Sequence, residues 1–375
     1  MIRPAKMPPR SAPRLLPIDA LRGLIMILMA LDHASYFAAH KHSSEHWGGG
    51  LTTYPDALSF FTRWLTHLAP TGFFFLMGAG MVLFAHARRR MGWSEWAITR
   101  HLLVRGSFLL GLKFLVVNRI WELGPFPMSI IYLGVLFGLG GSMIFGSLLL
   151  RLKPAYLPVI ACAFTMGLQF LYPAPSQWGQ FDILGLAFLY TGGDMRLWSN
   201  YPILPWLGLT TLGMIFGHLL TRDDKRASWL ALGTGLAFLL AFVVLRRLGG
   251  YGNIRPLQDT GWMDFLNVVK YPPSMVFILV TLGMDLVLLW LFAQVGWKAQ
   301  RLLRGLAVFG QTPLLFYALH LCLYMALGRW LTPHGTSLPA MYPIWLAGLA
   351  ILFPLCLAYG RFKQRQPANS PWHFF

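Results

Sequence analysis

Long apolar runs constrain this chain more than any other feature of its sequence. About ten of them approach the roughly 20 residues that a helix needs to cross a bilayer, and polar or basic segments separate them. Transmembrane strands would instead alternate apolar and polar residues over short segments. We therefore predict an all-α integral membrane protein, a polytopic bundle of about ten transmembrane helices. The expected spans are residues 16–38, 60–86, 102–118, 128–150, 155–172, 203–220, 228–246, 273–295, 305–331 and 341–360.

The charged residues agree with a membrane protein and set its expected orientation. They make up only 12% of the chain, whereas soluble domains have about 25%. The formal net charge of +18 does not indicate a nucleic-acid partner, because the basic residues form short clusters between apolar runs rather than one stripe. If the N-terminus is cytoplasmic, every inner segment carries such a cluster, as the positive-inside rule favours. We therefore expect both termini in the cytoplasm.

This orientation divides the chain into three parts. A basic cytoplasmic tail covers residues 1–15, the transmembrane domain covers residues 16–360, and a second basic cytoplasmic tail covers residues 361–375. The first apolar run follows basic residues, as in a secretion signal, but it is long and carries charges, so we predict an uncleaved span. The stretch 183–190 is too short to cross and is expected to be interfacial or re-entrant.

The first run carries four ionisable residues into the expected span: Asp19, Arg22, Asp32 and His33. Each such group costs several kcal/mol in hydrocarbon, about 3 kcal/mol by insertion scales, so it needs a partner or a function. Asp19 and Arg22 are three residues apart and predict an ion pair near the inner surface. Arg22 and His33 are eleven residues apart and point almost the same way at about 100° per residue.

A second group of ionisable side chains is expected at the outer depth of His33. Arg63 and His67 lie in the first turns of the next span, one above the other at i,i+4. Glu122 ends the third span on the same side. Asp32 diverges from His33 by about 100° and is a candidate partner of Arg63. The sequence therefore predicts an outer vestibule. Three histidines of the first outer loop are expected close above it: His40, His42 and His46.

Other interpretations of these residues compete. Four side chains of the first outer loop are potential zinc ligands: His40, His42, Glu45 and His46. Their spacing matches no strong ligand pattern, so we expect no metal. Deeper in the membrane, Lys113 and Asp285 are expected to form an ion pair. His320 lies near mid-span, where it is either a packed histidine bonded to a carbonyl or a functional residue.

Five blocks, in order and spread over nearly the whole chain, resemble the bacterial members of the heparan-alpha-glucosaminide N-acetyltransferase catalytic-domain family. They are IDALRGLIMILMALDHA (Ile18–Ala34), TRWLTHLAPTGFFFLMGAG (Thr62–Gly80), YPILPWLGLTTLGMIFG (Tyr201–Gly217), KYPPSMVFILVTLG (Lys270–Gly283) and GQTPLLFYALHL (Gly310–Leu321). The first block also resembles the first helix of membrane O-acyltransferases that modify bacterial surface polysaccharides. In those enzymes the histidine after the LRG motif is assigned to catalysis, and His33 holds that position.

The resemblance implies acetyl transfer across the bacterial inner (plasma) membrane, from cytoplasmic acetyl-CoA to a sugar or other envelope acceptor on the outer side. His33 would take the acceptor's proton or itself become acetylated. Arg63 or His67 would stabilise the oxyanion, with Asp32 completing the catalytic group. Arg22 is suited to the CoA phosphates. Substrate binding is expected at three further residues: Glu122, His320 and Tyr271.

Two questions stay open. The animal lysosomal enzyme resembles RGLIMILM but has asparagine in the register of His33, and its catalytic histidine lies farther on, so His40, His42 or His46 is the alternative base. A transporter or flippase of an envelope precursor is the alternative function, because intramembrane charges are equally natural there, and a structural scaffold is the third. Expected partners are acyl-CoA, the acceptor and the lipid bilayer, without nucleic acid, and homo-oligomerisation is left open.

Overall fold

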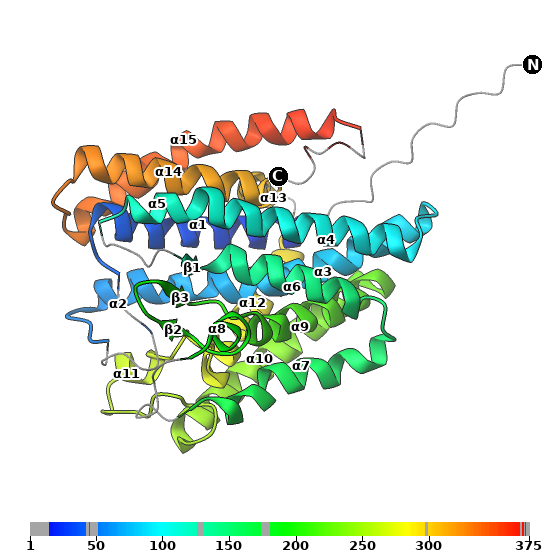
Figure 1. The fold of residues 1–375 in the computed structure, drawn as a ribbon, viewed down its shortest axis with the longest axis horizontal. Helices are drawn as coiled ribbons and strands as arrows, with labels where there is room; N and C mark the ends of the chain where they lie inside the picture. Colours follow the sequence, from blue (N-terminus) through cyan, green and yellow to red (C-terminus); the bar gives the residue numbers. More distant parts are fainter. Residues whose placement is uncertain are drawn as a thin grey trace, which may run out of the picture.

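The long helices lie side by side along the long axis of the molecule (Figure 1). The computed structural model describes residues 15–42, 45, 52–125, 131–173, 181–296, 299–367, 370 and 372. In these residues, eight helical segments are long and apolar enough to cross a membrane. They are Ala57–Arg90, Glu95–Glu122, Pro154–Leu171, Ile203–Arg222, Asp224–Leu248, Met275–Gln294, Pro313–Leu331 and Leu338–Gln364. The all-α, polytopic membrane class is therefore confirmed.

Several of these segments consist of more than one helix. Ala57–Arg90 contains α2 (Ala57–Trp64), the 3-10 turn η1 (Leu65–His67) and α3 (Leu68–Arg90). Glu95–Glu122 contains α4 (Glu95–Leu112), the π-helical turn η2 (Lys113–Val117) and α5 (Asn118–Glu122). Pro154–Leu171 contains η3 (Pro154–Tyr156), α7 (Leu157–Thr165) and η4 (Gly167–Leu171). The single helices among the eight are α9 (Ile203–Arg222), α10 (Asp224–Leu248), α12 (Met275–Gln294), α14 (Pro313–Leu331) and α15 (Leu338–Gln364).

The remaining elements complete the bundle. They are α1 (Leu16–Ala38), α6 (Val135–Leu149), α8 (Ile183–Phe188), α11 (Trp262–Leu266) and α13 (Gln300–Gly310). One small sheet has the order β1-β3-β2, formed by β1 (Ile131–Leu133), β2 (Gly192–Gly193) and β3 (Leu197–Ser199). β1 is parallel to β3 and β2 is antiparallel to it. α8 has six residues, which confirms that this stretch is too short to cross.

Each predicted span coincides with helix, although one prediction needs correction. The span predicted at 16–38 is α1 itself, and the beginning of the span predicted at 128–150 lies outside the described residues. The span predicted as continuous at 305–331 is divided between α13 and α14. Thr312 leaves the helical conformation, with φ −129° and ψ 48°, because Pro313 follows it and disfavours a helical residue at that position.

Close backbone contacts between helices place α1 against α13. A Cβ atom on Gly23 would lie 1.9 Å from the Leu306 carbonyl oxygen, and one on Gly310 would lie 1.9 Å from the Asp19 carbonyl oxygen. Small residues at such crossings are typical of membrane helices, where close packing replaces the hydrophobic effect between helices. α14, which carries His320, also lies against α1, because a Cβ atom on Gly328 of α14 would lie 2.2 Å from the Phe37 carbonyl oxygen.

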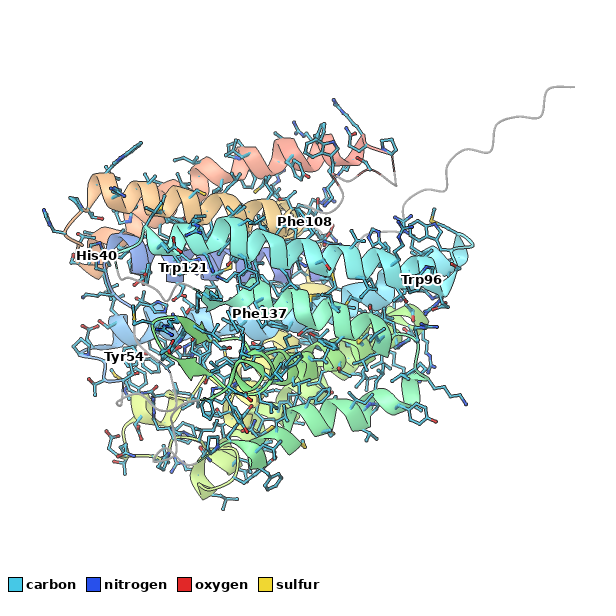
Figure 2. All side chains as sticks on the ribbon, in the orientation of Figure 1. His40, Tyr54, Trp96, Phe108, Trp121 and Phe137 are labelled. Carbon is cyan, nitrogen blue, oxygen red and sulfur yellow. The ribbon has the colours of Figure 1, made fainter. Side chains whose placement is uncertain are left out.

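The two ends of the bundle differ in the elements they carry. His40 and Tyr54 lie at one end and Trp96 lies at the opposite end (Figure 2). α2 and α11 are also at the end of His40, on the left in Figure 1. The predicted orientation makes this the outer end.

Candidate functional site

A small cavity of about 60 Å³ lies inside the bundle at the level of His33. We call it the chamber. Its polar lining comes from segments far apart in the sequence: Asp32 and His33 of α1, His42, Thr66 of η1, Lys113 of η2, Trp121 of α5, Tyr132 of β1, Tyr201, Lys270, Tyr271 and Tyr317 of α14. Tyr201 and Tyr271 are linked by their hydroxyl oxygens at 3.2 Å. The chamber therefore concentrates polar groups within an otherwise apolar bundle.

His33 forms a hydrogen-bonded pair with His320. The distance from His33 Nδ1 to His320 Nε2 is 2.6 Å, and His320 Nδ1 is 2.9 Å from the Phe316 carbonyl oxygen. A carbonyl oxygen only accepts, so His320 Nδ1 is the donor and, in a neutral ring, Nε2 is an acceptor. His33 Nδ1 must then donate to it. Neutral His33 consequently keeps its lone pair on Nε2, which is what a general base requires.

Aromatic rings hold this pair in place. Trp121 meets the His33 ring edge-on at a centroid distance of 5.4 Å, and Phe316 stacks on His320 at 5.2 Å. His33 is 8% exposed and His320 is fully buried. Packing and hydrogen bonding therefore fix both the orientation and the tautomer of His33.

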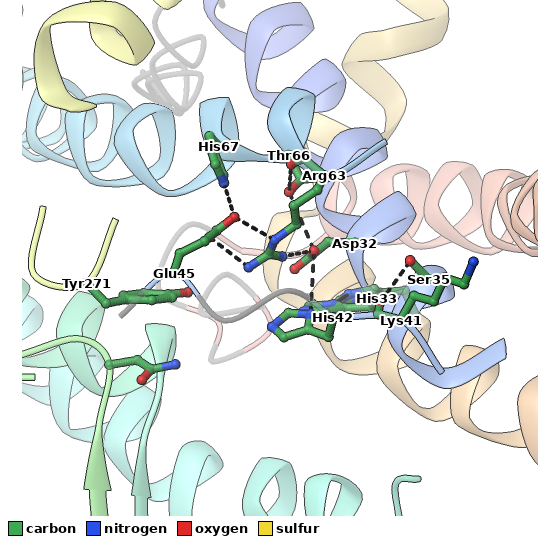
Figure 3. Close-up of polar contacts among 12 residues, drawn as sticks. Asp32, His33, Ser35, Lys41, His42, Glu45, Arg63, Thr66, His67 and Tyr271 are labelled. Atoms are coloured by element: carbon green, nitrogen blue, oxygen red, sulfur yellow. Dashed lines mark hydrogen bonds and ion pairs between the residues drawn. The ribbon is translucent and has the colours of Figure 1, made fainter. Parts of the chain in front are cut away.

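A second cluster, which we call the outer network, adjoins the chamber (Figure 3). Arg63 makes two hydrogen bonds to Glu45, from Nε and Nη2, each of 2.8 Å. Its third nitrogen, Nη1, donates to Asp32. His67 Nε2 lies 2.5 Å from Glu45 Oε1. The network thus joins α1, α2, η1 and the first outer loop through buried, charge-assisted bonds.

Electrostatics in the loop favour an ionised Glu45. Burial raises the pKa of Glu45, but the adjacent Arg63 and His67 lower it more, so the net direction is well below the ordinary value. His42 adds a weaker contact, with Nδ1 3.8 Å from Asp32 Oδ1. The outer network is therefore an anionic pair held around one guanidinium.

Two larger cavities flank the chamber. The inner cavity has a volume of about 310 Å³ and is lined mainly by apolar side chains, with the basic residues Arg22, Arg105 and Lys363 among them. The outer cavity, of about 300 Å³, has a more polar lining that includes Asp32, Tyr54 and Arg63.

The inner cavity shares Phe73, Val135 and Tyr317 with the chamber. The outer cavity shares Asp32 and His42 with it. The three spaces therefore adjoin one another in series.

The structure brings most of the predicted site residues together. Asp32 pairs with Arg63, as predicted, and His33, His320 and Tyr271 all line or adjoin the chamber. Arg22 donates to Asp19 at 3.2 Å, which confirms the predicted ion pair, and it also lines the inner cavity. His320 fits both interpretations, because it bonds to a carbonyl and also to His33.

Other predicted placements are corrected. Glu122 pairs with Arg119 at 2.7 Å and lines none of the three cavities, so it lies apart from His33, while its role in substrate binding stays a prediction. The predicted Lys113–Asp285 pair does not form: Lys113 donates to Asn118, and Asp285 accepts from Thr71 at 3.3 Å. The expected pairing of Lys113 with Asp285 rests only on their similar depth in the membrane, and equal depth does not make two helices neighbours.

The loop histidines divide. His42 lines the chamber. His40, whose own φ is 52°, instead packs near Gly335. His46 falls outside the described residues. Within the described residues there is no group of three or more His, Cys, Asp or Glu side chains that could hold a metal ion.

Sequence reasoning missed Glu45, Lys113 and Lys270 as parts of the site. Glu45 was considered only as a zinc ligand, yet it is fully buried and bonds to both Arg63 and His67. Lys270 is 3% exposed and lines the chamber. The signal available for it was a lysine directly before the block YPPSM, at the outer end of an apolar run.

Comparison with known proteins agrees with this architecture. The family model described as heparan-alpha-glucosaminide N-acetyltransferase, catalytic, matches residues 14–249, which is more than half of the chain. A comparison with curated proteins found no match. The family match includes His33, Arg63 and Lys113, while Lys270 and His320 lie beyond it. The chain is a multi-pass membrane protein that belongs to the heparan-alpha-glucosaminide N-acetyltransferase catalytic family.

Proposed function

We propose that this protein is a membrane acetyltransferase of the bacterial inner membrane. It transfers an acetyl group from cytoplasmic acetyl-CoA to a sugar or other envelope acceptor on the outer side. The observation that carries the proposal is a histidine with an available lone pair, His33, in a chamber that adjoins one cavity toward each end of the bundle. A donor and an acceptor can approach such a histidine from opposite sides without sharing a path.

The inner cavity suits the donor. Its volume of about 310 Å³ is within the range of small-molecule sites, roughly 300–1,000 Å³. Arg22 and Arg105 supply positive charge for the phosphates of CoA, and the apolar lining suits the pantetheine arm. Phe73, Val135 and Tyr317 lie at the boundary through which the thioester would enter the chamber. The donor cavity therefore accounts for the charge that the sequence places at the inner end of α1.

His33 supplies the base. Its Nε2 takes the proton of the acceptor hydroxyl or amine as that group attacks the thioester carbonyl carbon. The imidazolium that forms keeps its Nδ1–H bond to His320. His320 is therefore a positioning residue, which holds the ring and its tautomer throughout the proton transfer.

The outer cavity suits the acceptor. Tyr54 offers an aromatic face, and Asp32, Ser59 and Thr62 offer polar groups. Sugars are bound by this combination of stacking and hydrogen bonding. Asp32 also lines the chamber, so an acceptor held by Asp32 is close to the space that His33 lines.

The test reconstitutes the protein in sealed vesicles that contain acetyl-CoA, with candidate acceptors supplied outside. The panel contains amino sugars, neutral sugars and sugar-lipid precursors. We expect release of CoA inside the vesicles together with appearance of an acetylated acceptor outside, and neither product in vesicles without protein. Movement of the acceptor across the membrane without release of CoA would contradict the proposal and favour a transporter.

A further inference from the structure

Lys113 is a buried cation that the proton transfer by His33 does not use. Its side chain is 0% exposed and lines the same chamber as His33. It begins η2, the π-helical turn that connects α4 and α5. Such turns are rare within α-helices and frequently occur at functional sites. A lysine inside a membrane bundle is costly, by about 3 kcal/mol on insertion scales, so its position requires a reason.

The neighbours of Lys113 contact its ammonium group without neutralising it. Nζ donates to Asn118 Oδ1 and lies 4.5 Å from the centroid of the Tyr132 ring. An amide oxygen and an aromatic face both attract an ammonium group but carry no net charge. Among the described residues, Lys113 forms no salt bridge with a carboxylate. An ammonium has three N–H donors, and these two contacts leave at least one of them for a ligand.

The backbone beside Lys113 makes room for it. A Cβ atom on Gly134 would lie 3.1 Å from Lys113 Cε and 2.9 Å from Tyr132 Cε1. Both distances are shorter than ordinary van der Waals contact, so a larger residue at position 134 would displace the Lys113 or the Tyr132 side chain. Tyr132 is itself fixed, because its hydroxyl accepts a hydrogen bond of 2.9 Å from Asn200. The cation therefore occupies a prepared position rather than a chance one.

The position lies on the donor side of the chamber. Gly134 lines the chamber and directly precedes Val135, which lines both the chamber and the inner cavity. Arg63 and His67, the oxyanion donors expected from the sequence, are not in the chamber lining and are engaged by Glu45 and Asp32. Lys113 thus lies close to where a thioester from the inner cavity would meet His33.

We propose that Lys113 is a catalytic residue that donates a hydrogen bond to the thioester carbonyl oxygen and stabilises the negative charge that develops there. The inference rests on the proposed acetyl transfer. The acceptor oxygen or nitrogen bonds to the carbonyl carbon, and its proton passes to His33 Nε2. The carbon–sulfur bond then breaks, the electron pair leaves with the CoA sulfur, and His33 returns the proton to give the free thiol. Lys113 keeps its own proton throughout.

The test compares two acetyl-CoA analogues on purified Lys113→Met. One has a methyl ketone in place of the thioester and stays planar; the other has a trifluoromethyl ketone, which hydrates to a tetrahedral form. We expect kcat to fall about 100-fold, as for loss of one oxyanion donor. Affinity for the tetrahedral analogue should fall by a similar factor, while affinity for the planar analogue stays within about twofold. Lys225→Met, at an exposed position in α10, is the matched control and should change none of these values.

A second variant tests the same role of Lys113 if the Lys113→Met protein folds poorly. Asn118→Asp keeps the hydrogen bond from Lys113 Nζ but places a carboxylate beside it, which neutralises the positive charge of the ammonium group. We therefore expect kcat and the affinity for the tetrahedral analogue to fall about tenfold. The inference is overturned if kcat of both variants stays within threefold of the unmodified protein, or if the two analogues lose affinity equally. If the unmodified protein releases no CoA, the proposed function fails; if it does and the variants match it, only the role of Lys113 fails.

Discussion

The outer network and the chamber are neighbours that share Asp32, yet their polar groups are used in opposite ways. In the network all three guanidinium nitrogens of Arg63 donate to carboxylates, and Glu45 accepts from both Arg63 and His67. In the chamber, His33 keeps a lone pair on Nε2 and Lys113 keeps its charge without a carboxylate partner. Groups whose donors and acceptors are all paired stabilise the structure. Groups that keep a free lone pair or N–H can bind a ligand and react.

This difference separates the expected effects of substitution. Removing one partner of a buried ion pair strands the other charge, so changes in the network should reduce stability. Removing a group that still has a free lone pair or N–H should reduce kcat strongly and should lower stability less than breaking a buried ion pair. Measuring both quantities for each variant therefore tests whether the two regions are distinct.

The largest expected effect is at His33. His33→Ala removes the base and should lower kcat for acetyl transfer by about 10⁴-fold, at the upper end of what general-base catalysis contributes. The free energy of unfolding should fall by only about 1–3 kcal/mol, because His320 Nε2 loses its buried partner while no charge is left unpaired. Kinetics of CoA release and unfolding curves of the purified protein are the measurements. Full activity in this variant would remove His33 from the mechanism and favour a loop histidine.

Two substitutions of His320 serve as a matched pair for that result. His320→Gln retains an oxygen acceptor in the region of Nε2, whereas His320→Leu removes it. If His320 positions His33, the glutamine variant should keep more activity than the leucine variant, and the pH profile of kcat should shift only in the latter. Equal losses in the two variants would indicate a packing role instead.

The next effect is on stability, at Arg63. Arg63→Met leaves Glu45 and Asp32 without their cation and should lower the free energy of unfolding by about 3–5 kcal/mol. Arg119→Met is the control, because the Arg119–Glu122 pair is exposed and should contribute less than about 1 kcal/mol. A stable Arg63 variant that has lost kcat would assign Arg63 to the chemistry and erase the distinction between the two regions.

Helix periodicity accounts for the parts of the site that the sequence predicts. The Asp19–Arg22 pair follows from their spacing on one face, and the Asp32–Arg63 pair follows from depth and direction in adjacent antiparallel spans. Glu45 lies in a loop, where no periodicity relates its sequence position to its place in space. The error at Lys113 has a different source, because its expected pairing with Asp285 rests on depth alone, and depth does not show which helices are neighbours.

The pairing of His33 with His320 depends on tertiary contact. The two residues are 287 positions apart, and their approach depends on the close packing of α1 against α14, where Gly328 lies next to the Phe37 carbonyl. Neither helix alone encodes that contact. The sequence thus predicts which side chains enter the membrane more readily than which of them meet.

The smallest expected effect concerns Lys270, which lies at the boundary between the two regions. Burial, and then the nearby Arg63, lower the pKa of Lys270 to about 8, although Glu45 and Asp32 oppose them. The folded state therefore binds this proton less tightly than the unfolded state, which lowers stability below pH 8. Stability should recover as the pH rises from about 8 toward the ordinary value of 10.5.

Unfolding free energies at pH 7, 8 and 9 check this expectation. The unmodified protein should gain on the order of 1 kcal/mol relative to Lys270→Met between pH 7 and pH 9. The methionine variant retains the titration of every other group, so the difference between the two curves isolates Lys270. Parallel curves would mean that Glu45 and Asp32 hold Lys270 charged as a member of the outer network. If the unmodified protein instead gains stability over the Lys270→Met variant as the pH rises, Lys270 resembles His33 and Lys113, which have no carboxylate partner among the described residues.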